Sequence, residues 1–120
     1  MKKTVVFGAS PNPQRYSYIA TQMLQDADVE VVPLGIRKGQ AAGLDIILEW
    51  PSGLDNIHTL TLYLGPKNQP EHYAYMLSLK PKRIIFNPGT ENPELSGLAS
   101  LQGIEVVETC TLVMLRTGQY

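Results

Sequence analysis

The residues Thr4-Val5-Val6-Phe7-Gly8-Ala9-Ser10-Pro11-Asn12-Pro13 decide the class of fold. Residues 4–7 are an apolar, β-branched run that ends at Gly8, which predicts a buried strand followed by a turn. Beyond the turn, residues 16–27 place apolar side chains on one side of a helix, at Ile19, Ala20, Met23, Leu24 and Ala27. A buried strand that leads through a glycine turn into an amphipathic helix is the first half of a βαβ unit, so we expect a parallel sheet.

The same alternation continues along the chain. Further strands are expected at 29–32, 60–64, 83–86 and 104–107, with a short one at 44–48. Further helices are expected at 68–79, 92–103 and 109–117, opened by capping side chains at Asn68, Asn92 and Thr109. The strands are too apolar to have a solvent-exposed face. The prediction is an α/β, three-layer Rossmann-like fold, with a parallel sheet of about five strands and helices on both faces.

The composition fits a single domain over residues 1–120. The chain is 43% hydrophobic, too apolar for disorder, and its net charge of −1 excludes nucleic-acid binding through overall basicity. One cysteine excludes an intrachain disulfide, and two histidines argue against a structural zinc site. No apolar run approaches the roughly 20 residues of a membrane span, and no signal-peptide hydrophobic region follows Met1-Lys2-Lys3. We therefore expect a cytoplasmic protein with neither a membrane nor a nucleic-acid partner.

The loop after the first strand is the first candidate for a ligand site, because open parallel sheets bind ligands at the carboxyl ends of their strands. Gly8 allows a sharp turn and a close approach of ligand to backbone, and the amides that follow, from Ala9 on, attract a phosphate. Ser10 adds a hydroxyl and Arg15 a cation. The full G-x-G-x-x-G fingerprint is missing, so an ordinary strand-to-helix turn remains the alternative.

The loop after the second strand distinguishes between nucleotides. An NAD site has an acidic residue at this place, whereas this loop has none and carries Gly35, Arg37 and Lys38. Cations at this place suit a phosphorylated ribose, either the 3′-phosphate of coenzyme A or the 2′-phosphate of NADP. The alternative is that both side chains are ordinary solvated surface charges.

The third and fourth strand-end loops carry Gly65-Pro66-Lys67 and Asn87-Pro88-Gly89. The strand ends lack the aspartate cluster of a phospho-receiver domain, and no Ser-His-Asp or Cys-His set is evident, so no catalytic residue is predicted. Cys110 stands at a helix start that would stabilise a thiolate, although a buried structural cysteine is the favoured interpretation. His72 could face the cleft, but a surface position is favoured.

These residues together resemble a known family. The run 8–17, which opens a small Rossmann unit, resembles the stand-alone CoA-binding domain proteins, and these are similar to the N-terminal domain of the succinyl-CoA synthetase alpha subunit. The resemblance extends over essentially the whole chain, including residues 110–120. The synthetase's second domain, with its phosphorylated histidine, has no counterpart here, so ligase activity is not implied. The loop after the first strand also has fewer glycines than in the synthetase.

The resemblance implies a set of CoA contacts. The loop that wraps the CoA phosphates would be matched by Gly8, Ala9, Ser10 and Arg15, and a Lys-Lys-Gly near the phosphorylated ribose by Arg37-Lys38-Gly39. The turns that flank the rest of the cofactor would be matched by Gly65-Pro66-Lys67 and Asn87-Pro88-Gly89.

The expected function is therefore a small protein that holds CoA or an acyl-CoA and performs no catalysis of its own. One alternative is an NADP-binding oxidoreductase or redox-sensor domain, which would need a second catalytic region for which 120 residues leave little room. Another is an interaction module that kept the fold and lost the ligand. The sequence leaves the partner open between an acyl-transfer enzyme and a second copy of the chain.

Overall fold

Five parallel strands form the central sheet. The computed structural model describes residues 2–120. Its central strands are β1 (Thr4–Ala9), β2 (Val31–Gly35), β5 (Thr59–Leu62), β6 (Arg83–Phe86) and β7 (Glu105–Glu108). Their order across the sheet is β2-β1-β5-β6-β7, and each neighbouring pair is parallel. The predicted parallel sheet is confirmed.

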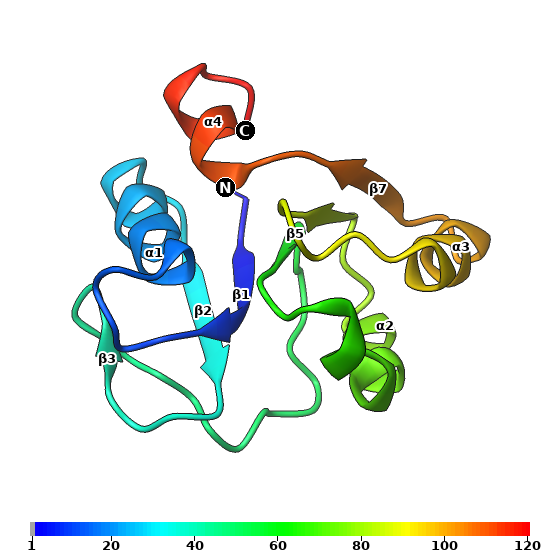
Figure 1. The fold of residues 1–120 in the computed structure, drawn as a ribbon, viewed down its shortest axis with the longest axis horizontal. Coiled ribbons are helices and arrows are strands. Elements are labelled where there is room, and N and C mark those ends of the chain that lie inside the picture. Colours follow the sequence, from blue (N-terminus) through cyan, green and yellow to red (C-terminus); the bar gives the residue numbers. More distant parts are fainter. Residues whose placement is uncertain (1) are drawn as a thin grey trace.

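Helices cover both faces of this sheet (Figure 1). One face carries α1 (Tyr16–Asp26) and α4 (Thr111–Arg116), and the other carries α2 (Tyr73–Ser78) and α3 (Pro93–Leu101). Two 3-10 turns, η1 (Pro66–Asn68) and η2 (Pro70–His72), precede α2, and a hairpin of β3 (Gln40–Ala41) and β4 (Leu44–Asp45) follows β2. The α/β, three-layer Rossmann-like prediction is therefore confirmed. Within residues 2–120 no helix is both long and apolar enough to cross a membrane.

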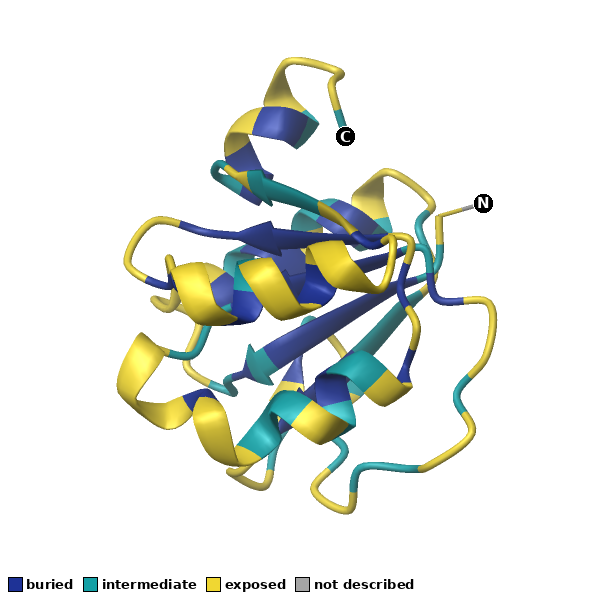
Figure 2. Cartoon of the chain, turned by 90° about the vertical axis from the view of Figure 1, so that its right-hand side faces the viewer, coloured by how far each residue is buried: buried dark blue, intermediate teal, exposed yellow. Residues whose placement is uncertain are grey.

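The core explains the apolar character of the central strands. Phe7, Leu62 and Phe86 lie in register on neighbouring strands, face α2 and α3, and are fully buried. Figure 2 shows these central strands as buried and the outer surfaces of the helices as exposed. The expectation that no strand has a solvent-exposed face is wrong at β7, where Glu105 and Glu108 are exposed. Because β7 lies at the edge of the sheet, these charges hinder its pairing with another sheet.

The connection between β5 and β6 is less helical than the helix expected at 68–79. Pro66 and Pro70 each begin a 3-10 turn, and only Tyr73–Ser78 forms an α-helix. Proline has no N–H to donate, so two prolines this close together interrupt a continuous helical ladder. Asn68 therefore caps no helix. Asn92 does cap α3 as predicted, since its Oδ1 accepts from the amides of Glu94 at 3.0 Å and Leu95 at 3.2 Å.

The strand expected at 44–48 is present only in part. Leu44–Asp45 pairs with β3 in the hairpin, and Ile47 alone lies beside β2, where it forms an isolated parallel bridge with Leu34. The Ile47 amide donates to the carbonyl of Pro33 at 2.9 Å, and the Ile47 carbonyl accepts from the Gly35 amide at 3.1 Å. This bridge stands where the third strand of a Rossmann sheet would lie, outside β2.

Candidate functional site

The order of the strands locates the candidate site. From β1 the chain goes to β2 on one side and later returns to β5 on the other, so the order reverses between β1 and β5. Ligands of open α/β sheets bind at such a switch point, beyond the carboxyl ends of the strands. Gly8 lies there with φ of +101°, and a Cβ on it would stand 3.2 Å from the backbone carbon of Tyr63. The strand was expected to end at Gly8, but β1 continues to Ala9 with a register shift at Gly8, and the end of β1 approaches the residue after β5 closely because residue 8 is a glycine.

The loop after β1 is held by its own side chains. The Asn12 amide donates to Ser10 Oγ at 3.1 Å, and the Gln14 amide donates to Asn12 Oδ1 at 3.0 Å. Arg15 is exposed and is the N-cap residue of α1, but no side chain caps this helix start. The loop thus presents the Ser10 hydroxyl proton, the first amides of α1 and an exposed guanidinium on one short segment. These are donors that suit a phosphate.

The loop after β2 packs directly against the loop after β1. A Cβ on Gly39 would stand 2.7 Å from Pro11 Cβ, and a Cβ on Gly35 would stand 2.5 Å from the carbonyl oxygen of Ala9. Two glycines are therefore required for this contact. The exposed cations Arg37 and Lys38 lie between them, and the ion pairs found among residues 2–120 do not involve either one.

The third loop begins the 3-10 turn η1, and its residues Gly65, Pro66 and Lys67 are exposed. It faces the switch point from the side of β5 and so belongs to the same edge of the sheet as the first two loops. The structure therefore brings the first three predicted loops to one edge, with four exposed basic side chains at Arg15, Arg37, Lys38 and Lys67.

The fourth loop uses its polar groups within the protein. Asn87 is buried, and its Nδ2 donates to Thr61 Oγ1 at 2.8 Å and to the Leu62 carbonyl at 2.9 Å. Its Oδ1 accepts from the Thr111 amide at 2.9 Å, which gives α4 the cap that was expected from Thr109. Pro88 and Gly89 are exposed, and the Gly89 amide donates to a Glu91 carboxylate oxygen at 2.8 Å. The side chain of Asn87 thus holds β5, β6 and α4 together.

A glutamine that sequence reasoning missed ties the third loop to the fourth. Gln69 is fully buried, and its Nε2 donates to the carbonyls of Leu64 at 2.9 Å and Thr90 at 2.8 Å. Its Oε1 accepts from Asn92 Nδ2 at 2.8 Å. A glutamine between an asparagine and a proline looks like a surface residue, so the sequence carried no signal of this role.

An aromatic cluster lies beside the switch point. The ring of His72 packs against Phe7 and Trp50, at centroid distances of 5.7 and 4.8 Å, and the Trp50 indole N–H donates to the Gly35 carbonyl at 3.0 Å. The His72 side chain is 22% exposed, and its Nε2 lies 3.8 Å from a carboxylate oxygen of Glu71. His72 therefore packs beneath the candidate site, so the favoured surface position is only partly right.

Two further groups lie on the face under α4. Cys110 is a free, half-buried thiol and the N-cap residue of that helix. The Tyr63 hydroxyl is enclosed without a hydrogen-bond partner among the described residues, and burial raises the pKa of Tyr63 to about 12. Tyr63 is therefore a neutral phenol at physiological pH.

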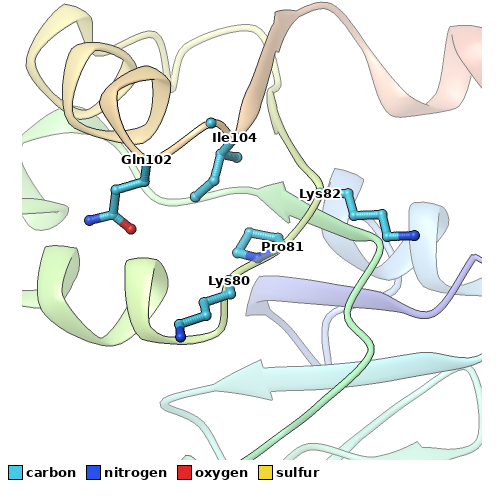
Figure 3. Close-up of a pocket in the computed structure, with 6 residues that line it drawn as sticks. Lys80, Pro81, Lys82, Gln102 and Ile104 are labelled. Carbon is cyan, nitrogen blue, oxygen red and sulfur yellow. The ribbon is translucent and has the colours of Figure 1, made fainter.

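Two surface hollows lie away from the candidate site. They have volumes of about 430 and 420 Å³, open at the opposite, amino edge of the sheet, and include no residue of the four strand-end loops. Figure 3 shows the hollow of about 430 Å³. The candidate site is formed by loops that converge at the carboxyl edge of the sheet. Within residues 2–120 no group of three or more metal-ligating side chains comes together.

The strand order and the helices on both faces define a Rossmann-like α/β domain. A family model described as a CoA binding domain matches residues 2–116. The chain belongs to this CoA binding domain family.

Solved structures share the whole fold. A crystal structure described as that of an uncharacterized protein is 50% identical, with a TM-score of 0.96 over 100% of this chain and 98% of the other. A hypothetical protein from Pyrococcus horikoshii OT3 is 27% identical, with a TM-score of 0.83 over 97% of this chain and 82% of the other. A Thermus thermophilus protein at 20% identity is similar in fold, with a TM-score of 0.82 over 99% of this chain and 90% of the other. The search of curated proteins found no match.

Proposed function

We propose that this protein binds coenzyme A, free or acylated, across the carboxyl ends of β2, β1 and β5. The observation that supports the proposal is the contact between Gly39 and Pro11, which joins the backbone of the second loop, with its cations Arg37 and Lys38, to the first loop. CoA has phosphates at two separate places, the pyrophosphate and the 3′-phosphate of the ribose. Two adjoining groups of donors match this arrangement.

The first group would hold the pyrophosphate. The backbone at Gly8 and Ala9 can approach a ligand closely, the Ser10 hydroxyl can donate to a phosphate oxygen, and Arg15 supplies charge at the start of α1. The second group, Arg37 and Lys38, would hold the 3′-phosphate, whereas Gly35 would act only indirectly, because it is buried and its amide and carbonyl already bond to Ile47 and Trp50. Because Arg37 and Lys38 are exposed and belong to no ion pair found among residues 2–120, they can turn toward a ligand without breaking an existing interaction.

The remaining loops would enclose the rest of the cofactor. Gly65, Pro66 and Lys67 lie across the switch point from the glycine turn, and Pro88 and Gly89 follow the next strand. Asn87 would act on the ligand only indirectly, by holding these strand ends in place. The proposed contacts are amides, a hydroxyl and cations, which favours binding without catalysis. The acyl group, the protein partner and a cytoplasmic location stay predictions.

NADP is the second candidate, because its 2′-phosphate would meet the same two cations. The family favours CoA. Calorimetric titration of the purified protein with CoA, dephospho-CoA, acetyl-CoA and NADPH distinguishes these ligands. We expect CoA to bind roughly 10- to 100-fold more tightly than dephospho-CoA, since a hydrogen bond to a charged group contributes ~1.5–3 kcal/mol.

The variant Arg37→Gln/Lys38→Gln should abolish this difference, and Arg116→Gln on the outside of α4 is the matched control. Equal binding of CoA and dephospho-CoA by the wild type would remove the role of the two cations. No binding of any CoA species would reject the proposed function, and tighter binding of NADPH would favour the second candidate. Release of free CoA from acetyl-CoA by the protein would contradict the absence of catalysis.

A further inference from the structure

Arg83 is a buried cation that has no buried anion beside it. Its side chain is 7% exposed, its Nε donates to Thr59 Oγ1 at 2.7 Å, and its Nη2 is enclosed without a hydrogen-bond partner among residues 2–120. The ion pairs found among these residues join Lys3 to Glu30 and His72 to Glu71, so neither neutralises Arg83. A guanidinium keeps its charge at any ordinary pH, and enclosing it without a counter-charge is unfavourable.

The surroundings of Arg83 add positive charge. In the register of the sheet, Thr4, Thr59, Arg83 and Glu105 form one row at the amino ends of neighbouring strands, and Glu105 is exposed at the edge. His58 precedes this row. Its pKa is lowered first by burial and then by Arg83, Lys2 and Lys82, with only Glu105 acting in the opposite direction. Three cations therefore surround this corner of the sheet.

Tyr120 covers the guanidinium. The Arg83 Cζ lies 4.5 Å from the centroid of the Tyr120 ring, and the Tyr120 hydroxyl and carbonyl form hydrogen bonds with Thr4 Oγ1 and Lys2 Nζ. The face of an aromatic ring attracts a cation but replaces a full negative charge only in part. The ring is itself half-buried, so it is a cover at the surface rather than part of the core.

Lys82 connects this corner with the hollows at the amino edge. Lys80, Pro81 and Lys82 line the hollow of about 430 Å³ together with Gln102, Gly103 and Ile104 (Figure 3). Both lysines also line the adjoining hollow of about 420 Å³. In Figure 3 their side chains extend in different directions on either side of Pro81. Arg83 itself lines neither hollow, but Lys82 precedes it in the chain and adds a cation at this edge of the sheet.

We propose that the amino edge of the sheet holds a second site, which binds a divalent oxyanion of the phosphate type at Arg83, with Lys2 and Lys82 at the rim and Tyr120 as a cover that moves aside. A guanidinium matches the geometry of phosphate oxygens, and three cations around one site favour a double negative charge over a single carboxylate. The site lies at the opposite edge from the candidate CoA site and does not rest on the proposed function.

The test compares thermal unfolding of the wild type and Arg83→Met in chloride, acetate and phosphate at constant ionic strength. Methionine keeps an apolar stem of similar length and removes the charge. In chloride we expect Arg83→Met to melt at a higher temperature than the wild type, because the uncompensated cation is gone. In phosphate the wild type should gain a saturable rise in Tm that the variant lacks, and acetate should produce a smaller rise.

Phosphate also suits the candidate CoA site, so only the difference between the wild type and Arg83→Met counts. Arg116→Met, which changes an exposed arginine on α4, is the matched control and should respond to phosphate like the wild type. An equal phosphate response in the wild type and Arg83→Met would overturn the proposal, as would an Arg83→Met that is less stable in every buffer. Equal effects of acetate and phosphate would overturn the choice of a divalent anion.

Two measurements keep the proposal testable if Arg83→Met does not fold. The Arg83 Nε–H signal in the NMR spectrum of the wild type should shift saturably with phosphate, and Lys82→Gln should weaken this titration several-fold. Tyr120→Ala should strengthen it several-fold by removing the cover. A signal that does not move with phosphate, or a titration unchanged by Lys82→Gln, rejects the site. A titration weakened by Tyr120→Ala rejects the cover.

Discussion

Replacing Asn87 by leucine removes three buried hydrogen bonds while nearly preserving the shape of the side chain. The lost bonds join Asn87 to Thr61 Oγ1, to the Leu62 carbonyl and to the Thr111 amide, at 2.8, 2.9 and 2.9 Å. The Thr111 amide is the first of α4 and has no capping side chain on its own helix. In Asn87→Leu it becomes a buried donor without a partner.

The expected loss of stability is about 2–6 kcal/mol. A buried polar group left without a partner costs ~1–3 kcal/mol, and each ordinary hydrogen bond contributes a further ~0.5–1.5 kcal/mol. With a urea m-value of ~1.5 kcal/mol/M for a domain of this size, the unfolding midpoint should fall by roughly 1–4 M. Trp50 is the single tryptophan and is partly buried against the core, so its fluorescence follows the transition alongside circular dichroism.

Asn68→Ala is the matched control, because Asn68 is exposed and caps no helix. It should change the stability by no more than about 0.5 kcal/mol. An Asn87→Leu variant as stable as Asn68→Ala would refute the account of Asn87 as the residue that joins β5, β6 and α4. A large loss of CoA affinity in an equally stable Asn87→Leu would instead make Asn87 a direct ligand contact.

Three further predictions follow from the backbone and from the buried phenol. Gly39→Ala should cost about 1–3 kcal/mol in urea unfolding and weaken CoA binding in calorimetry, because residue 39 has φ of +149° and its Cβ would meet Pro11. The control is Gly97→Ala at an exposed position of α3, which should be neutral or stabilising. Equal behaviour of the two variants would contradict the contact between Gly39 and Pro11. Ala42→Gly should raise stability by roughly 0.5–1 kcal/mol, since Ala42 has φ of +52° in the turn between β3 and β4, and an unchanged midpoint would show that this turn carries no strain. The pKa of Tyr63 is raised from 10.0 to about 12, so the stability that the neutral phenol contributes is complete below pH 10 and is lost as the pH rises toward 12. Tyr63→Phe should flatten the fall in Tm over this range, and identical pH profiles of the variant and the wild type would contradict this prediction.

Local signals in the sequence were reliable where one element decides the outcome. The buried strands, the helix over residues 16–26 and the cap at Asn92 follow from the spacing of apolar residues and from one side chain that bonds to nearby amides. Local signals failed where two of them compete. Asn68 and Glu71 match a helix start, but Pro66 and Pro70 break the segment into 3-10 turns, and the cap expected from Thr109 comes instead from Asn87, 24 residues before Thr111.

The sequence predicted which loops form the candidate site, but it did not predict how the side chains of these loops are arranged in the folded protein. The four strand-end loops were identifiable because parallel strands end at one edge of a sheet. The sequence did not reveal that the buried side chain of Asn87 donates to the Leu62 carbonyl, or that the buried side chain of Gln69 links the third loop to the fourth by donating to the Thr90 carbonyl. Both residues are polar and stand next to prolines, which is typical of exposed loops.

The sequence by itself determined the α/β class, the parallel sheet and the edge where a ligand is expected, because the spacing of apolar residues and the places of glycine and proline are properties of short segments. Only the tertiary structure decided which segments meet. It placed Gly39 against Pro11, and it placed the ring of Tyr120 over the buried charge of Arg83 at the opposite edge. Such contacts depend on strand order, on register and on close packing between residues far apart in the chain, and no short stretch of sequence contains that information.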